Sequence, residues 1–339
     1  MNKTGSKCLK CGGVAVINMR QHKLALCEEH FLEWLPQQVQ RSIEKYKMFT
    51  PEDRLLVAVS GGKDSLSLWD ILLRLGYQAD GLYISLGIGS GDEDDAVEDN
   101  GGDYSQQSLA RCQEFVSGFR FQVSGQPALH VVDIAREYGE SIPQLAARTT
   151  RGRGARRACS VCGLVKRHVM NRVTRDGGYG VLATGHNLDD EAAVLFGNVL
   201  HWQTGYLLRQ APVLPADKPG LARKVKPLCR LYEREMAAYA LVRGIDYIYD
   251  ECPYAVGASS IYYKEQLNQM ELDHPGAKLQ FYLGFLQARQ AGFFASQVDQ
   301  VELAACDNCG QPTSVPTAGG QRLCAFCRLW DKDSLPLEC

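Results

Sequence analysis

The run Ser60-Gly61-Gly62-Lys63-Asp64-Ser65 constrains the fold more than any other part of the chain. It follows the apolar stretch 55–59 and precedes leucines and an isoleucine at helical spacing, so it predicts a strand, a phosphate-binding loop and a helix. Two glycines let the backbone approach an oxyanion closely, and Ser60 and Ser65 add hydroxyl donors to the backbone amides. The Walker pattern differs, because its glycines are more widely spaced and precede Lys-Ser/Thr. The alternative is a polar turn in which Asp64 or Ser65 caps the next helix.

Beyond this loop the chain alternates between strand and helix patterns. We expect strands at 80–86, 128–134 and 179–184, and helices at 105–119, 164–173 and 192–200. This alternation predicts an α/β fold with a doubly wound, mostly parallel sheet and helices on both faces. Ligands of such sheets bind beyond the carboxyl ends of the strands, which is where the phosphate loop falls. A length of 339 residues permits about two domains.

The chain holds 13 cysteines, and their expected role depends on whether the protein is in a reducing or an oxidising compartment. It has no apolar stretch approaching the ~18 residues that a membrane span requires and no leader-like N-terminus, so we expect a cytoplasmic protein without membrane contact. In a reducing compartment, many cysteines favour metal binding or catalysis over a disulfide framework.

Eight metal-ligating residues fall into two groups with zinc-site spacing. Cys8-x-x-Cys11 is followed by Cys27-x-x-His30, and Cys306-x-x-Cys309 by Cys324-x-x-Cys327. Four thiolate or imidazole ligands predict a closed, structural Zn²⁺ site in each case, although His22 could replace His30 and scattered core cysteines are the alternative. We therefore expect an N-terminal zinc finger with a linker helix at 1–48, a catalytic domain at 49–298 and a C-terminal zinc ribbon at 299–339.

A third cysteine group consists of Cys159, Cys162 and Cys252. Three thiolates cannot close a zinc site alone, but they can hold a [4Fe–4S] cluster with one iron left open. A thioredoxin-like redox pair at Cys159 and Cys162, or burial of all three, are the alternatives. Burial is the expected fate of Cys229, which falls in a strand-like stretch, and 245–249 also has a strand pattern.

Charged residues are unevenly distributed around these motifs. The stretch from Gly185 to Glu191 lies at the same predicted sheet edge as the phosphate loop. Its carboxylates could hold Mg²⁺ or orient a triphosphate. The structural alternative is that Asn187 or Asp189 caps the following helix. The insert 89–104 contains seven carboxylates and no base, and we expect it to be a disordered loop; without them the formal net charge would rise from −2 to +5. Basic residues surround Cys159 and favour a polyanion there, or form only a solvated loop: Arg148, Arg151, Arg153, Arg156, Arg157, Lys166, Arg167, Arg172 and Arg175.

Taken together, these motifs resemble a known family over nearly the whole chain. The loop at Ser60–Ser65 resembles the PP-loop of ATP pyrophosphatases, which cleave ATP between the α and β phosphates. Ala158–Gly163 with Lys166, Ala183–Ala193, Cys252-Pro253 and the flanking zinc motifs are similar to the TtuA-type tRNA 2-thiouridine synthetases. The acidic insert departs from the expected family pattern.

The resemblance implies ATP-dependent thiolation of uridine 54 in the tRNA T-loop. It implies that Cys159, Cys162 and Cys252 carry a [4Fe–4S] cluster whose open iron takes sulfide, and that Lys166 and Asp190 act at the ATP and acceptor site. It also implies a sulfur donor that is a ubiquitin-like carrier with a C-terminal thiocarboxylate, and a homodimer.

The chemistry of thiolation is consistent with this set of motifs. A carbonyl oxygen of a nucleobase is a poor leaving group, so transfer of AMP to it, with release of pyrophosphate, would allow sulfide to displace it. We expect ATP to be bound by Ser60, Gly61, Gly62, Lys63, Asp64, Ser65 and Gly185, with Mg²⁺, Lys63 and Asp64 acting on the phosphates. Alternatives are a thiolase for wobble uridine 34, a cytidine thiolase, a lysidine-type ligase and a non-enzymatic tRNA-binding sensor.

Overall fold

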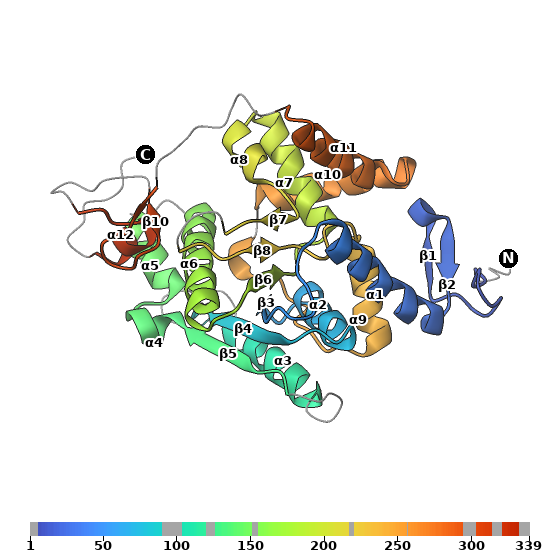
Figure 1. Ribbon diagram of the computed structural model, residues 1–339, viewed down its shortest axis with the longest axis horizontal. Coiled ribbons are helices and arrows are strands. Elements are labelled where there is room, and N and C mark those ends of the chain that lie inside the picture. The colour runs from blue at the N-terminus through green and yellow to red at the C-terminus, as the bar shows by residue number, and fades with distance from the viewer. Residues whose placement is uncertain are drawn as a thin grey trace.

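The computed structural model describes residues 6–89, 104–119, 126–150, 155–216, 220–255, 257–293, 303–313 and 321–331. A six-stranded sheet forms its centre, with the strand order β5-β4-β3-β6-β8-β7 (Figure 1). The strands are β3 (Leu55–Val59), β4 (Ala79–Ser85), β5 (Leu129–Asp133), β6 (Val181–Thr184), β7 (Val213–Leu214) and β8 (Lys224–Val225). All neighbouring pairs are parallel except β7 with β8. The predicted doubly wound, mostly parallel α/β fold is confirmed.

Strand β3 lies in the middle of the sheet and is buried on both faces. Leu55 and Val57 face one apolar core, whereas Leu56 faces the other, as the alternation of side chains along a strand requires. Gly81 on the neighbouring strand β4 is needed because a Cβ there would lie 2.5 Å from the indole of Trp69. The continuous apolar run of β3 is typical of a strand covered on both faces.

Two helical layers cover the sheet. One face packs on α1 (Glu28–Lys45), α2 (Lys63–Arg74), α3 (Tyr104–Phe119) and α9 (Glu233–Arg243), and the other on α4 (Ile134–Tyr138), α5 (Ile142–Thr150) and α6 (Ala155–Asp176). A third helical group packs around α7 (Leu188–Leu200) and contains α8 (Thr204–Arg209), α10 (Ser259–Asp273) and α11 (Ala277–Gln290) (Figure 1).

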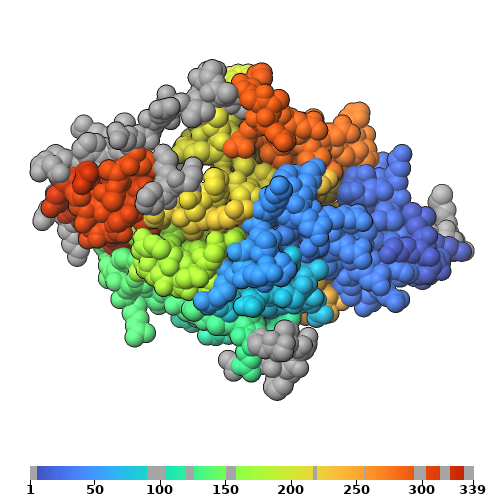
Figure 2. Space-filling view, viewed as in Figure 1, coloured from blue at the N-terminus to red at the C-terminus, as the bar shows by residue number. Residues whose placement is uncertain are grey.

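Small modules lie at the two ends of the molecule (Figures 1 and 2). The N-terminal one contains the hairpin of β1 (Ile17–Met19) and β2 (Leu24–Leu26) with η1 (Arg20–His22) between them, and the C-terminal one contains β9 (Ala304–Ala305), β10 (Pro312–Thr313) and α12 (Ala325–Trp330). The C-terminal module packs on α6, where the rings of His168 and Phe326 stack with their centroids 3.5 Å apart. The domain boundaries at 48 and 298 stay predictions.

The structure corrects several expected elements. The strand expected at 245–249 is wrong: this segment has no ladder partner among the described strands, and Ile248 N donates a 2.9 Å hydrogen bond to Gly61 O. The strand expected around Cys229 is also wrong, because Cys229 lies in a turn, although its burial is confirmed. Helix α6 begins at Ala155 and α7 at Leu188, both earlier than expected.

Two hydrogen bonds between Ile88 and Ser105 connect the segments on either side of the acidic insert. Ser105 N donates to Ile88 O over 3.2 Å, and Ile88 N donates to the Ser105 hydroxyl over 2.9 Å. Residues 90–103, and with them the expected disordered loop, lie outside the described residues. Among the described helices, none has the length and apolar character needed to cross a membrane.

Candidate active site

The phosphate loop follows β3 and leads directly into α2, as the sequence predicted. Gly61 has a φ of +76° and packs against α3 so closely that a Cβ would lie 2.6 Å from Ser108 O. The Ser65 hydroxyl accepts a hydrogen bond from Ser60 N (3.1 Å) and donates one to Gly62 O (3.0 Å). Gly62, and not Asp64 or Ser65, is the N-cap of α2, so the capping alternative is wrong. The loop is thus held in shape by its own serines and by Gly61, whose positive φ and close approach to Ser108 strain any other residue.

The loop before α7 lies against the phosphate loop. A Cβ at Gly185 would lie 2.9 Å from both N and Cα of Ser65, so this glycine permits the contact. Asn187 donates from Nδ2 to Asp64 Oδ1 over 3.1 Å, and Asn187 and Asp190 form a reciprocal capping box at the start of α7. The capping interpretation of Asn187 is therefore confirmed, and the same side chain also fixes Asp64.

Two lysines and three carboxylates form a charged network around the N-terminus of α2. Lys63 Nζ lies 2.7 Å from Glu233 Oε1 and 3.3 Å from Asp64 Oδ2. Lys264 Nζ lies 2.6 Å from Asp190 Oδ1 and 3.3 Å from Glu233 Oε2. Glu233 of α9 and Lys264 of α10 are members that the sequence did not reveal, since neither lies in a recognisable motif.

The carboxylates of this network are close enough to shift the pKa of Asp64 upwards. Burial is the largest cause, and the negative charges of Asp190 and Glu233 add to it, whereas Lys63 and Asn187 oppose it; the result is a pKa of about 6. Burial lowers the pKa of Lys63, but Asp64 and Glu233 outweigh it and raise the pKa. The site therefore holds an excess of negative charge that a bound cation would relieve.

The Asp64→Asn variant is expected to be more stable than the wild type at pH 7. A carboxyl group with a raised pKa binds its proton more tightly in the folded state, so folding stability falls as the pH rises from the ordinary Asp value through about 6. An uncharged amide removes this cost, which is at most about 3 kcal/mol. Urea unfolding at pH 7 and pH 4.5 tests this: the variant should be stabilised at pH 7 and much less at pH 4.5. Equal unfolding midpoints at pH 7 would contradict it.

The remaining carboxylates of the 185–191 stretch pair with lysines other than Lys63 and Lys264. Asp189 is buried, pairs with Lys278 and accepts a 2.9 Å hydrogen bond from Glu233 N. Glu191 is also buried and pairs with Lys226 at 2.7 Å. Of the acidic run that we considered for Mg²⁺, only Asp190 therefore reaches the network beside the phosphate loop.

The structure brings the three-cysteine group together. Cys159 and Cys162 lie in the first turns of α6, and Cys252 lies immediately before η2 (Pro253–Ala255); the Cys159 thiol donates to Tyr254 O over 3.2 Å. Burial raises the pKa of Cys162, Lys166 opposes this, and Cys252 and Cys159 raise it further, so all four side chains interact. Full burial, one of the alternatives, is wrong, because Cys159 is exposed and the other two are half-buried.

The cysteine spacing fits a cluster better than a single ion. The only described groups with ligand atoms all within 4.8 Å of one another are the two predicted zinc sets, so at least one pair of the three thiol sulfurs is more than 4.8 Å apart. A cubane is wider than an ion and needs such separation. Three thiols from two elements, one of them exposed, could hold such a cluster.

The basic residues near these cysteines are partly neutralised. Arg148 pairs with Glu140 at 2.9 Å, and Arg172 pairs with Glu137. Arg151 and Arg153 lie outside the described residues, as do the side chains of Arg156 and Arg157. The described part of the expected cationic field is therefore Lys166 and Arg167, with Arg175 paired to Asp176.

Both zinc sets converge as the sequence predicted. Cys8, Cys11, Cys27 and His30 form one, and Cys306, Cys309, Cys324 and Cys327 the other. His30 Nδ1 lies 3.1 Å from Cys27 Sγ, whereas His22 lies instead 3.0 Å from Glu235, so His30 is the fourth member. Burial opposes ionisation of Cys8 and Cys306, but backbone amides outweigh it and lower both pKa values to about 6, which favours thiolates for a metal.

Loss of a ligand from the C-terminal zinc set should lower the local stability of α6. The Cys309→Ser variant removes one ligand, and structural zinc contributes roughly 10 kcal/mol or more to folding of such modules. We expect about one zinc ion less per chain and faster amide hydrogen exchange around His168, which stacks on Phe326 of α12. Metal analysis and exchange mass spectrometry measure both. Unchanged zinc content would contradict the assignment.

Comparisons with known proteins agree with this arrangement. Residues 7–32 match the family profile described as "2-thiouridine synthetase TtuA, N-terminal LIM domain". The chain is 48% identical, over 96% of its length and 91% of the relative's, to the tRNA-5-methyluridine(54) 2-sulfurtransferase of Thermus thermophilus, and 40% identical, over 95% of each, to that of Thermotoga maritima.

A solved structure shares the fold. The U34-tRNA thiolase NcsA from Methanococcus maripaludis, solved with its [4Fe–4S] cluster, superimposes with a TM-score of 0.73 at 20% identity, and the match covers 99% of this chain and 98% of that one. The near full-length identity to the two bacterial sulfurtransferases is the stronger relation. The chain belongs to the tRNA-5-methyluridine(54) 2-sulfurtransferase family.

Proposed function

We propose that this protein catalyses ATP-dependent 2-thiolation of uridine 54 in tRNA. One observation carries the proposal: the segment 245–252 connects the phosphate loop to the three-cysteine group. Its Ile248 N bonds Gly61 O over 2.9 Å, and it ends at Cys252, which interacts with Cys162. A nucleobase bound along this segment would therefore lie between the phosphate loop and the thiols. The 48% identity to a position-54 enzyme supports the target.

The loop and its network are suited to adenylation. Backbone amides of the loop would bind phosphate oxygens of ATP, and Lys63, now held between Asp64 and Glu233, would offset the charge that develops as pyrophosphate leaves. Asp190 and Asp64 present the oxygens that Mg²⁺ prefers, and the ion would supply further charge compensation to the phosphates. Lys264 keeps Asp190 and Glu233 in place by pairing with both.

The thiols would hold the sulfur-carrying group. Cys159, Cys162 and Cys252 would ligate a [4Fe–4S] cluster, which supplies a site where sulfide is kept ready for the activated base. Lys166 opposes the raised pKa of Cys162 and so favours the thiolate that a ligand must be. The two outer sets would each hold Zn²⁺. From the family resemblance, the proposal includes a thiocarboxylated ubiquitin-like sulfur carrier and a homodimer.

Wobble uridine 34 is the second candidate target, because the NcsA neighbour acts there. An anaerobic assay separates the two: purified protein is reconstituted with iron and sulfide, supplied with ATP and unmodified tRNA, and the RNA is digested and mapped by mass spectrometry. We expect 2-thiolated product at position 54, with about four iron atoms and about two zinc ions per chain. Thiolation at 34 alone would replace the target. Binding of tRNA without pyrophosphate release would favour the sensor alternative.

A further inference from the structure

Two tyrosines, Tyr247 and Tyr249, form a pair of contacting rings beside the phosphate loop, which we call the aromatic step. The rings of Tyr247 and Tyr249 lie with their centroids 4.3 Å apart at 38°. Tyr247 is buried, but 71% of Tyr249 is exposed. An exposed ring that lies against a second ring has the shape of a stacking surface.

This aromatic step lies close to the phosphate loop. The rings of Tyr247 and Tyr249 contact each other, so the two side chains lie on the same side of the chain, while Ile248 N between them bonds Gly61 O. Burial raises the pKa of Tyr247, and Tyr249 and Asp64 raise it further whereas Lys63 opposes them, so the ring lies within electrostatic reach of the loop side chains.

A third tyrosine lies on the side of the cysteines. Tyr104, Cys162 and Cys252 are partly buried and pack against the same apolar core. Tyr104 begins α3, the same helix whose Ser108 packs against Gly61. Aromatic rings therefore flank the region between the phosphate loop and the thiols.

We propose that Tyr249, supported from below by Tyr247, stacks on the uracil ring of the target nucleotide. This inference rests on the proposed function. Proteins commonly bind unpaired RNA bases by stacking them on aromatic side chains, and a base that undergoes chemistry must leave its own stack. The adenine of ATP needs to reach only the phosphate loop, whereas the target base must lie between the loop and the cysteines, which is where this step is.

Tyr249 variants test the stacking role. Because stacking uses the ring and not the hydroxyl, Tyr249→Phe should keep kcat/KM for tRNA within about twofold, whereas Tyr249→Ala should lower it roughly tenfold to a hundredfold. The KM for ATP should stay unchanged in both. Tyr206→Ala on α8 is the matched control, since Tyr206 is also exposed, at 59%, but lies away from the loop. Thermal unfolding checks that the exposed position leaves the fold intact.

Several outcomes would overturn the proposal. If Tyr249→Ala keeps the wild-type kcat/KM for tRNA, or if Tyr249→Phe is as defective as Tyr249→Ala, stacking is not its role. If the KM for ATP rises instead, the ring serves adenine. Failure of the proposed function is recognised separately, because the wild-type protein itself would then make no thiouridine.

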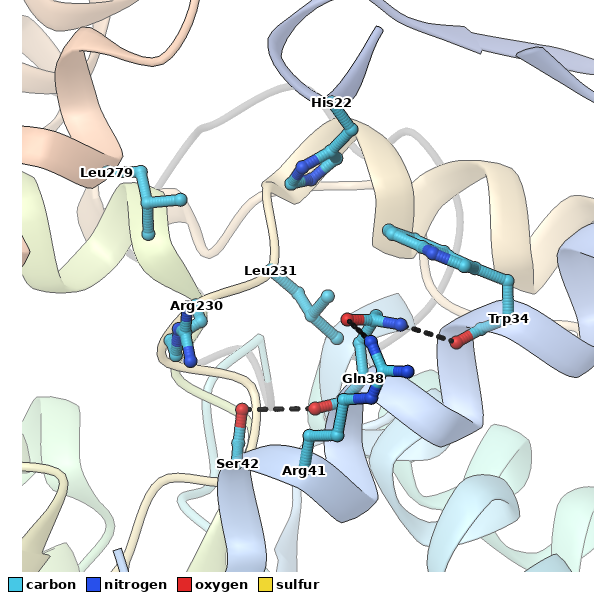
Figure 3. Close-up of a pocket in the computed structure, with 8 residues that line it drawn as sticks. All are labelled: His22, Trp34, Gln38, Arg41, Ser42, Arg230, Leu231 and Leu279. Carbon is cyan, nitrogen blue, oxygen red and sulfur yellow. Dashed lines mark hydrogen bonds between the residues drawn. The ribbon is translucent and has the colours of Figure 1, made fainter. Parts of the chain in front are cut away.

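A cavity between the N-terminal module and the catalytic domain carries a second, independent inference. It has a volume of about 270 Å³, and its lining includes His22, Trp34, Gln38, Arg41 and Arg230 (Figure 3). Arg41 makes one side-chain hydrogen bond, to Gln38 at 3.4 Å, and Arg230 has no carboxylate partner among the described residues. Trp34 presents a half-buried indole beside His22, with ring centroids 5.3 Å apart.

We infer that this cavity binds a nucleotide of the tRNA outside the reacting site. Two guanidinium groups without carboxylate partners suit a phosphate, and the indole suits a base. Each of Arg41→Ala and Arg230→Ala should weaken tRNA binding and reduce the slope of log K against log salt by about one, without changing the KM for ATP. Arg136→Ala, which removes an exposed arginine of α4, is the control for charge alone.

The binding assay needs no turnover, so it is independent of the proposed chemistry. Effects of Arg41→Ala and Arg230→Ala that are no larger than that of Arg136→Ala would overturn the inference. So would unchanged tRNA affinity together with lost transfer from the sulfur carrier, because the cavity would then serve the protein partner.

Discussion

The Lys63→Ala variant should lose at least about a hundredfold in the rate of ATP-dependent tRNA thiolation. Lys63 opens α2 at the phosphate loop and is the cation closest to both Asp64 and Glu233 in this network. Without it, the charge developing on the departing pyrophosphate would lose a direct partner, and Asp64 would lose the lysine that opposes its protonation. Asp64→Ala should be similarly defective. Single-turnover thiolation with purified protein measures the rates.

The zinc and iron contents of these variants should not change, because the loop contacts neither cysteine set directly. Glu233 keeps Lys264 as a partner when Lys63 is removed, so the fold should survive. Lys45→Ala, at the end of α1, removes a lysine whose ammonium lies over the Tyr46 ring, 5.6 Å from its centroid, and not in the network, so this variant should thiolate at the wild-type rate. Near-normal turnover by Lys63→Ala would refute the role assigned to this side chain.

Single replacement of Cys159, Cys162 or Cys252 by Ser should abolish both cluster absorbance and thiolation. A three-thiolate cluster has no ligand to spare, whereas a dithiol mechanism needs only two cysteines. All three variants should retain both zinc ions, since the zinc sets use other residues. Absorbance, iron analysis and the anaerobic thiolation assay distinguish the cases. A cluster with an open position also predicts loss of activity in air and its recovery on reconstitution with iron and sulfide.

Cys229→Ala provides the control for these replacements. Cys229 is fully buried, and burial raises its pKa to about 12, so it is an inert thiol. Its removal should lower stability but leave iron and thiolation intact. If iron-free protein thiolates tRNA at full rate, or if the Cys252 variant stays active, Cys159 and Cys162 become candidates for sulfur-relay thiols instead.

The sequence predicted those parts of the structure whose residues are close together in the chain. The run from Leu55 to Ser65 predicted β3, the loop and α2, since apolar content, glycines and helical spacing all agree there. The metal sets were predicted by spacing alone, and the structure brings their ligand atoms within 4.8 Å. Where a short stretch of chain contains all the residues that determine an element or a metal site, the prediction from sequence agrees with the structure.

Contacts between distant segments were not predictable in this way. Glu233 lies 170 residues from Lys63 in the chain, and neither it nor Lys264 carries a spacing signal. The segment 245–249 has the β-branched and aromatic residues typical of a strand, yet it pairs with none of the described strands, and its backbone bonds the phosphate loop at Gly61 instead. Only the tertiary structure shows that this segment is part of the site.

The paired hydrogen bonds between Ile88 and Ser105 have a practical use. They fasten the two segments that the stretch 90–103 joins, so the distance to be bridged is set by the folded body and not by the length of the connection. Lengthening such a connection costs little, about 0.6 kcal/mol for each doubling. A fluorescent reporter or an affinity tag inserted there would be carried on the enzyme near its phosphate loop without disturbing it.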